Sequence, residues 1–214
     1  MIYKTVDGHT LALYVNEPAE PSAKLRAAVV FLNGGGWTGD LPQQFNQQSN
    51  TVAEHGAVGI EVKYRLLNKR DRTTPPRICV EDAKSAIRWV SSHASELKID
   101  PNRIAAAGGS AGGYMAAYAA MVPGWDAPGE PADVSAKPDA LVLFNPVLDN
   151  SPNGCGNPRF GQDDKRRSPL FFASSDVSPM LIQSGANDAF LHAAVLRMFQ
   201  KRPQADHVHC DLAI

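Results

Sequence analysis

The chain has 214 residues, of which 43% are hydrophobic and 20% charged, and its formal net charge is −1. A chain of this length buries enough apolar surface to fold without a disulfide framework. Its near-neutral charge removes the electrostatic argument for a nucleic-acid or anionic-membrane partner. We therefore expect one domain over residues 1–214 that acts on a small neutral molecule.

Cysteine spacing and the start of the chain bear on cofactors and location. Cys79, Cys155 and Cys210 show no CxxC spacing, and no group of histidines and acids has the spacing of metal ligands. We expect free thiols, no metal and no organic cofactor. Residues 1–15 lack the pattern of a signal peptide, and no apolar run reaches the roughly 18 residues of a membrane span. We expect a cytoplasmic protein, or a secreted or periplasmic one if a signal segment precedes residue 1.

Apolar patterns along the chain alternate between strands and helices. The expected strands cover residues 10–16, 27–33, 57–65, 103–109, 139–146, 178–185 and 207–214. The expected helices cover residues 80–97, 110–122 and 192–202. The first strand alternates as an antiparallel edge strand does, and the others include runs typical of strands buried in a parallel sheet. The order predicts an α/β fold with three layers (α/β/α), in which helices cover both faces of a mostly parallel sheet.

Two further segments carry specific expectations. Glu81 and Asp82 open the helix expected over residues 80–97, where carboxylates favour the helix dipole, so we expect them to cap the helix. Residues 150–178 are rich in Pro, Asn, Gly and Asp, and this stretch is too long for a simple connection. Two interpretations of it remain open, a lid over the substrate site and a passive insertion.

The strongest chemical signal is the G-x-S-x-G match over residues 108–112, which lies between an apolar strand and a helix of small residues. A strained turn from strand to helix projects the serine hydroxyl, and the flanking glycines allow close backbone approach. The start of the helix adds a partial positive charge that favours the attacking oxygen. Ser110 is therefore the predicted nucleophile, and a glycine-rich turn that binds a phosphate is the alternative.

A second glycine motif, Asn33 to Trp37 (NGGGW), directly follows the strand over residues 27–33. Glycines at that place let backbone N–H groups converge on a developing oxyanion. We expect Gly34 and Gly35, together with the Ala111 amide, to form the oxyanion hole. An ordinary flexible loop is the alternative. The serine motif downstream favours the oxyanion hole over it.

An acid and a base must complete a serine triad, and this type of fold supplies them after the serine in that order. Asp188 follows an apolar strand in a Gly-Ala-Asn-Asp turn and is the predicted acid, with an Asx-turn aspartate as the alternative. The histidines after it are His192, His207 and His209. His192 begins a helix, and the other two alternate on one face of the last expected strand. His209 and His207 remain candidates for the base, although neither lies in a loop beyond that strand.

Taken together, these motifs resemble the hormone-sensitive-lipase-like and the bacterial feruloyl and acetyl (xylan) esterase branches of the α/β-hydrolases. The resemblance covers nearly the whole chain and is carried by NGGGW, TGD, QF, EVKYRL, EDAKSAIRWV, IDPNRIAAAGGSAGG, LFNPV and SGAND, in that order. It implies the α/β-hydrolase fold and hydrolysis of short-chain carboxylic esters. Acetyl or feruloyl groups on a carbohydrate are the finer expectation, with a small-molecule or glycan ester as substrate.

The chain departs from this family in two places. Asn33 stands where most relatives carry histidine before the glycines, a position that shapes the oxyanion loop and transfers no proton. Relatives also carry a Gly-His loop shortly after the last strand, and this sequence stops at Ile214 before such a loop. We therefore expect a C-terminally truncated esterase domain. A non-catalytic hydrolase-like protein that binds small esters or glycans, and a peptidase of the same fold, are the alternatives.

Overall fold

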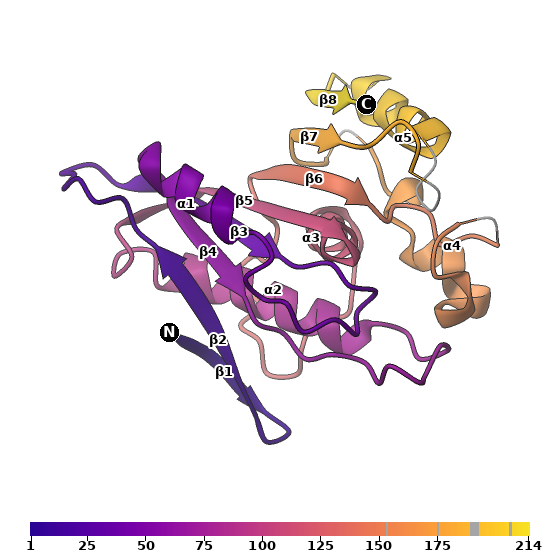
Figure 1. The fold of residues 1–214 in the computed structure, drawn as a ribbon, viewed down its shortest axis with the longest axis horizontal. Coiled ribbons are helices and arrows are strands. Elements are labelled where there is room, and N and C mark those ends of the chain that lie inside the picture. Colours follow the sequence, from indigo (N-terminus) through magenta and orange to yellow (C-terminus); the bar gives the residue numbers. More distant parts are fainter. Residues whose placement is uncertain (153, 175, 189–192, 206) are drawn as a thin grey trace.

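The computed structural model describes residues 1–152, 154–174, 176–188, 193–205 and 207–214. The strands are β1 Ile2–Val6, β2 His9–Asn16, β3 Arg26–Leu32, β4 Val58–Val62, β5 Ile99–Ser110, β6 Ala140–Pro146, β7 Met180–Gln183 and β8 Cys210–Ala213. The helices are α1 Asn46–Glu54, α2 Arg77–Ser92, α3 Ala111–Met121, α4 Asp164–Arg167 and α5 Ala193–Ala205. Short 3-10 turns, η1 Asn157–Arg159, η2 Gly161–Asp163 and η3 Pro169–Phe171, lie between β6 and β7. The predicted alternation of strands and helices is present (Figure 1).

The strands form a mostly parallel sheet in the order β1-β2-β4-β3-β5-β6-β7-β8. β2 is antiparallel to both of its neighbours, and the strands from β4 to β8 pair in parallel. The expected edge position of β2 is wrong, because β1 pairs with its outer side. Asp7 and Gly8 join the two strands with φ angles of 50° and 76°. An Asp-Gly turn with two positive φ angles is a strong hairpin signal, and it could have revealed β1 in the sequence.

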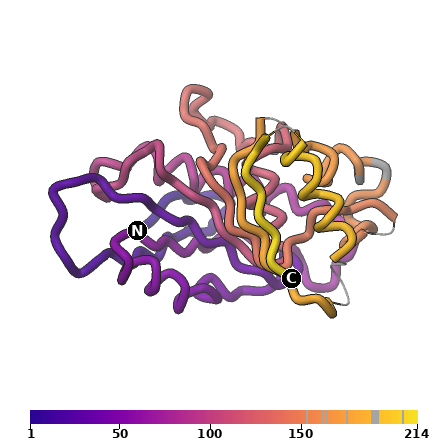
Figure 2. The backbone as a smooth tube through the Cα atoms, turned by 90° about the horizontal axis from the view of Figure 1, so that it is seen from above, coloured from indigo at the N-terminus to yellow at the C-terminus, as the bar shows by residue number. Residues whose placement is uncertain are grey.

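Helices lie on both faces of this sheet, as Figure 2 shows from above. α2, α3 and α5 contribute buried side chains to one large core with β3, β4 and β5. α1 packs on the opposite face against β4, where a Cβ on Gly59 would lie 2.3 Å from Ser49 Oγ. The predicted three-layer α/β-hydrolase arrangement is therefore confirmed. No helix in the described ranges has the length and apolar character needed to cross a membrane.

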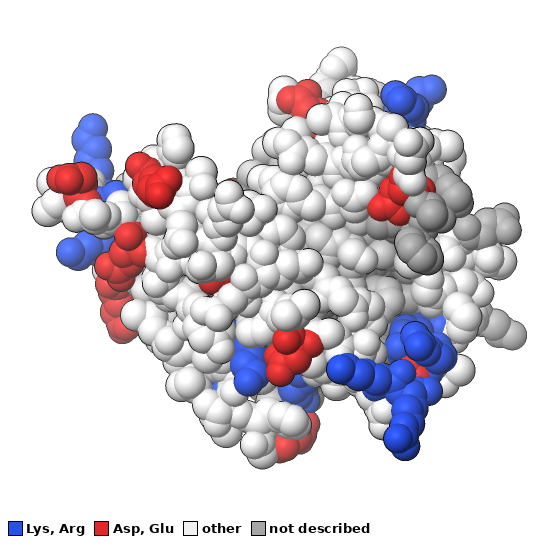
Figure 3. All heavy atoms as spheres, in the orientation of Figure 1, with Lys and Arg blue, Asp and Glu red and all other residues white. Residues whose placement is uncertain are grey.

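The face of the sheet that carries α1 is only partly covered. Val29, Phe31, Val52, Val142 and Phe144 line an open apolar groove of about 350 Å³ there. The centre of this face, beside α1, is largely without charged side chains (Figure 3). Among the described residues, the helices on this face of the sheet therefore leave an open apolar groove beside α1.

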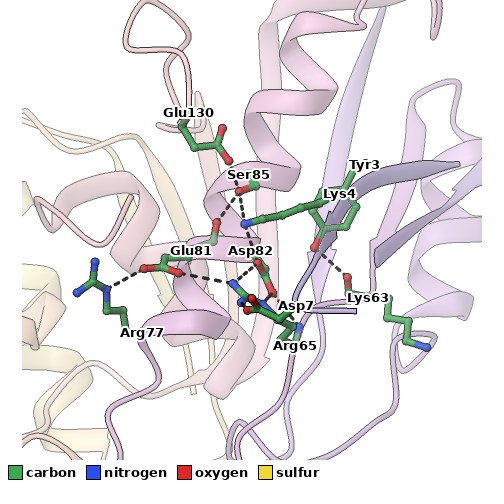
Figure 4. A network of polar contacts seen from close by, with 10 residues as sticks. All are labelled: Tyr3, Lys4, Asp7, Lys63, Arg65, Arg77, Glu81, Asp82, Ser85 and Glu130. Atoms are coloured by element: carbon green, nitrogen blue, oxygen red, sulfur yellow. Dashed lines mark hydrogen bonds and ion pairs between the residues drawn. The ribbon is translucent and has the colours of Figure 1, made fainter. Parts of the chain in front are cut away.

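A buried ionic network joins β1, the end of β4 and α2 (Figure 4). The Asp82 side chain is fully buried; it accepts hydrogen bonds from Arg65 Nε at 2.8 Å and Nη2 at 2.9 Å, and from Lys4 Nζ at 2.8 Å. Glu81 forms an ion pair with Arg77 at 2.7 Å. The expected capping role of the two acids is wrong, because α2 begins at Arg77 and places them in its second turn. Asp82 instead joins α2 to the N-terminal hairpin through Lys4, and Glu81 pairs with Arg77 of its own helix and with Arg65 at 3.5 Å.

Glu61, in the middle of β4, is buried and has no hydrogen-bond partner for either carboxylate oxygen among the described residues. Burial raises the pKa of this carboxyl, because the charged form loses its hydration. The folded state therefore binds a proton more tightly than the unfolded chain. The resulting contribution to stability is complete below the unfolded pKa and is lost as the pH rises through the folded pKa.

We expect Glu61→Gln to remove this pH dependence, because the amide does not ionise. The free energy of unfolding of the variant, relative to wild type, should rise between pH 4 and pH 8 in urea titrations. Glu54→Gln, at an exposed position of α1, is the matched control and should show no such trend. A difference between Glu61→Gln and wild type that is constant with pH would contradict the prediction.

Candidate active site

The turn at Ser110 joins the end of β5 directly to the start of α3. Ser110 is half-buried and has φ 51° and ψ −114°, a backbone conformation that is costly for a residue with a Cβ. A Cβ on Gly112 would lie 2.0 Å from the Leu32 carbonyl oxygen, and one on Gly108 would lie 2.5 Å from the Gly112 carbonyl carbon. The glycines of the motif are thus required by close backbone contacts, and the strained geometry is that of a nucleophile elbow.

The glycine loop after β3 lies directly against this turn. A Cβ on Gly34 would lie 3.5 Å from the Ser110 Cβ and 3.0 Å from the Gly109 carbonyl oxygen. Gly35 has φ 107°, which favours glycine, and a Cβ there would lie 2.9 Å from the Cα of Gly39. The structure therefore places Gly34 against Ser110, and Gly35 follows it in the same loop.

Asn33, the first residue of the NGGGW motif, holds the glycine loop through hydrogen bonds. Its Nδ2 donates to the Gly34 carbonyl at 2.7 Å and to the Gly39 carbonyl at 3.1 Å. The Tyr64 hydroxyl donates to the Asn33 carbonyl at 2.8 Å. Burial raises the pKa of Tyr64, which keeps this hydroxyl protonated and able to donate. Asn33 therefore has a structural task in the loop, as expected.

The three predicted oxyanion donors differ in their surroundings. The N–H of Gly34 donates to Gln44 Oε1 at 2.6 Å, so it already has an acceptor in this structure. Ala111 is the first residue of α3, and a backbone N–H at that place has no acceptor within its own helix. Gln44 belongs to the QF segment that carries the resemblance, but sequence reasoning gave it no role, because it lies ten residues beyond Gly34 in an irregular segment before α1.

Asp188 follows β7 and lies at the same carboxyl-terminal edge of the sheet as Ser110. Its N–H donates to the Gly185 carbonyl at 3.2 Å, and its Oδ2 accepts a hydrogen bond of 2.5 Å from Asn145 Nδ2. Burial raises the pKa of the Cys155 thiol, and the charge of Asp188 raises it further. The predicted acid is thus held by β6, beside the segment over residues 150–178.

The candidate bases in the last part of the chain lie elsewhere. β8 begins at Cys210, so the expected strand over residues 207–214 begins too early, and His207 and His209 both precede it. His207 has φ 63° and both side chains are exposed; His209 Nε2 contacts Asp211 Oδ2 at 2.9 Å. Because β8 is parallel to β7, this place is the amino-terminal edge, opposite to that of Ser110. His192 lies outside the described residues.

The segment over residues 150–178 folds onto the body of the protein. Phe160 is buried and packs edge-on against Trp37, the residue that ends the glycine loop. Arg159 donates to the backbone carbonyls of Asp71 at 2.9 Å and Thr74 at 3.0 Å. Phe160 and Arg159 therefore hold this segment beside the glycine loop. Whether the segment acts as a lid or is a passive insertion stays a prediction.

Comparisons with known proteins place the chain among esterases. The model of the BD-FAE family matches residues 11–139. The chain is 29% identical over 197 residues to "Probable carboxylic ester hydrolase LipM" of Mycobacterium tuberculosis. The matched region covers 81% of this chain and 44% of that protein. It is 35% identical over 114 residues to ethyl acetate hydrolase of Pseudomonas putida, covering 52% and 35% of the two chains.

Among solved structures, the apo form of Thermogutta terrifontis esterase 2 has a TM-score of 0.91 and 39% identity, covering 100% of this chain and 81% of that one. Other structures of the same esterase hold propionate or butyrate. The matched region thus spans less than half the length of the two curated relatives and about four fifths of the solved esterase.

Proposed function

The chain belongs to the BD-FAE family of α/β-hydrolase esterases, and from this premise we propose that it hydrolyses carboxylic esters with Ser110 as the nucleophile. One observation carries the proposal. Ser110 occupies a strained turn between β5 and α3, with Gly34 against it and Asp188 at the same edge of the sheet. The proposed nucleophile, oxyanion loop and acid therefore follow three different strands at the carboxyl-terminal edge of the sheet, where this fold places its chemistry.

In the proposed reaction, Ser110 Oγ attacks the ester carbonyl carbon and its proton passes to a histidine base. The N–H groups of Gly35 and Ala111 stabilise the oxyanion, and Gly34 joins them only if Gln44 releases its N–H. The alcohol leaves with the proton from the base, and water then releases the acid from acyl-Ser110. Asp188 orients the base and stabilises its charged form. No metal or organic cofactor takes part in these steps.

The base in this proposal is a histidine outside the described residues. His207 and His209 are poor candidates, because both precede β8 at the far edge of the sheet. A His207→Ala/His209→Ala variant should keep whatever ester hydrolysis the wild type has.

Short acyl groups are the substrate class that we propose. Support comes from a relative named for ethyl acetate and from the solved esterase that holds propionate or butyrate. Acetyl and feruloyl esters of carbohydrates are the finer candidates within this class.

Covalent trapping tests the proposal without depending on fast turnover. Paraoxon phosphorylates serine nucleophiles, and Thermogutta terrifontis esterase 2 is phosphorylated by it. We expect incubation of the 214-residue chain with paraoxon to place one diethylphosphoryl group on the peptide that contains Ser110, as read by mass spectrometry. Labelling spread over other serines, or absent from Ser110, would contradict the proposal.

A non-catalytic binding protein is the second candidate function. It is favoured by one observation: no histidine among the described residues hydrogen-bonds Ser110. Steady-state assays with p-nitrophenyl acetate, p-nitrophenyl octanoate and a peptide p-nitroanilide separate the candidates. Esterase function predicts turnover of the acetate above the octanoate and none of the anilide, whereas a peptidase cleaves the anilide and a binding protein turns over none of them.

A further inference from the structure

Asn145 occupies an irregular place in β6, next to the nucleophile. The pairing of β5 with β6 runs from Gly109 opposite Phe144 to Ser110 opposite Pro146, so Asn145 is the extra residue of a β-bulge. Its φ is 44°, in the left-handed region that asparagine tolerates better than most residues. Bulges of this kind occur next to active sites, where they redirect a side chain. The backbone at Asn145 therefore adopts a costly conformation. The bulge changes the direction of the Asn145 side chain.

The redirected side chain reaches across to the turn that follows β7. Asn145 Nδ2 donates to Asp188 Oδ2 at 2.5 Å and lies 3.3 Å from Ser184 Oγ. A hydrogen bond from an amide to a carboxylate is shorter and stronger than one between neutral groups.

The end of β6 at Asn145 contacts both the turn that carries Asp188 and the turn that carries Ser110. Val147, two residues later, donates its N–H to the Ser110 carbonyl at 3.2 Å, so the end of β6 is also tied to the nucleophile turn. Holding one carboxylate oxygen fixes the plane of the group and with it the direction of the other oxygen. The acid of a serine triad acts by orienting the histidine, which makes that direction important for the rate.

We propose that Asn145 is the positioning residue for Asp188, fixing the carboxylate relative to Ser110 through the bulge in β6. The inference rests on the proposed esterase function and deepens it. Asn145 does not touch the substrate in this role. It acts through Asp188, so its removal should slow the chemical step and leave substrate binding almost unchanged.

Two substitutions separate this role from a structural one. Asn145→Gly keeps the positive φ without strain and removes the amide, and Asn145→Asp keeps the shape and replaces the donor with a second carboxylate. For p-nitrophenyl acetate, we expect Asn145→Gly to lower kcat about 10²-fold and to change KM less than about twofold. Asn145→Asp should lose more activity at high pH and recover relative to wild type as the pH falls, because two ionised carboxylates repel each other.

A double-mutant cycle tests the link to the acid. If Asn145 acts through Asp188, then Asn145→Gly/Asp188→Ala should be no slower than Asp188→Ala alone. Asn102→Gly is the matched control: Asn102 also contacts an aspartate, Asp100, but at the opposite edge of the sheet, and kcat should not change. Additive losses in the cycle, or a loss confined to KM, would overturn the proposal.

NMR of the side-chain amides tests the contact independently of turnover. Asp188→Ala should move the Asn145 side-chain amide resonance and leave that of Asn102 in place. An unchanged Asn145 resonance overturns the inference whatever the activity. Absence of Ser110-dependent turnover in the wild type refutes the proposed function instead, and Ser110-dependent turnover with an undiminished kcat in Asn145→Gly refutes the positioning role alone.

Discussion

Replacing Ser110 by alanine is expected to lower kcat/KM for p-nitrophenyl acetate by about 10³-fold or more. In the proposed mechanism this hydroxyl forms the acyl-enzyme, and no neighbouring side chain can take its place at the turn between β5 and α3. The glycine loop and the start of α3 remain in the variant. A small residual rate from these N–H groups is therefore expected above the uncatalysed reaction.

Steady-state kinetics of wild type and variant check this prediction. Ser95→Ala is the matched control, since Ser95 is exposed in the turn after α2 and its loss should leave kcat/KM unchanged. Both variants should unfold at the wild-type temperature, because an alanine at residue 110 removes one oxygen from a half-buried place. Retention of most of the activity by Ser110→Ala would refute the nucleophile assignment.

The second large effect concerns stability and involves Asp82. Asp82→Ala is expected to lower the free energy of unfolding by about 3–5 kcal/mol, because Arg65 and Lys4 then keep their charges without the carboxylate that compensates them. The Arg65 side chain is only 8% exposed, so water cannot replace the lost partner fully. The contacts between the N-terminal hairpin and α2 should weaken first.

Urea denaturation followed by circular dichroism measures this loss. Asp133→Ala, at an exposed position, should stay within about 0.5 kcal/mol of wild type. Asp82→Asn keeps the shape and an acceptor oxygen for Arg65, so we expect an intermediate loss. Equal stability of Asp82→Ala and Asp133→Ala would show that the network contributes no net stabilisation.

The parts of the site that the sequence predicted are those encoded over short distances along the chain. The turn at Ser110 is signalled by an apolar strand, two flanking glycines and a small-residue helix within a single stretch. The glycine loop after β3 is equally local. The steric contacts of Gly112 with Leu32 explain why these residue types are needed, and this requirement leaves a visible motif.

The missed parts depend on contacts between residues far apart in the chain. Asn145 and Asp188 are 43 positions apart, and Lys4 and Asp82 are 78 apart. Which distant residues meet is decided by the order of strands in the sheet, and no periodic pattern records that order. The bulge at Asn145 is likewise invisible in a sequence, because asparagine before proline is also common in ordinary turns.

The last expected strand shows how local alternation can mislead. His207, His209 and Asp211 alternate with apolar residues, which is typical of a half-buried strand. α5 instead continues to Ala205, and His207 turns the chain with a positive φ before β8 begins at Cys210. The turn needed to reverse the chain after the helix takes up the residues that looked like the start of the strand.

The hydrogen bonds from Arg159 to the loop over residues 71–74 affect how freely the sequence of that loop can change. The Arg159 guanidinium binds two backbone carbonyls, those of Asp71 and Thr74, and every residue type supplies that acceptor. The side chains of the loop can therefore change in evolution while the two hydrogen bonds from Arg159 remain. Substitutions at residues 71–74 should therefore leave the contact in place as long as residue 159 remains an arginine.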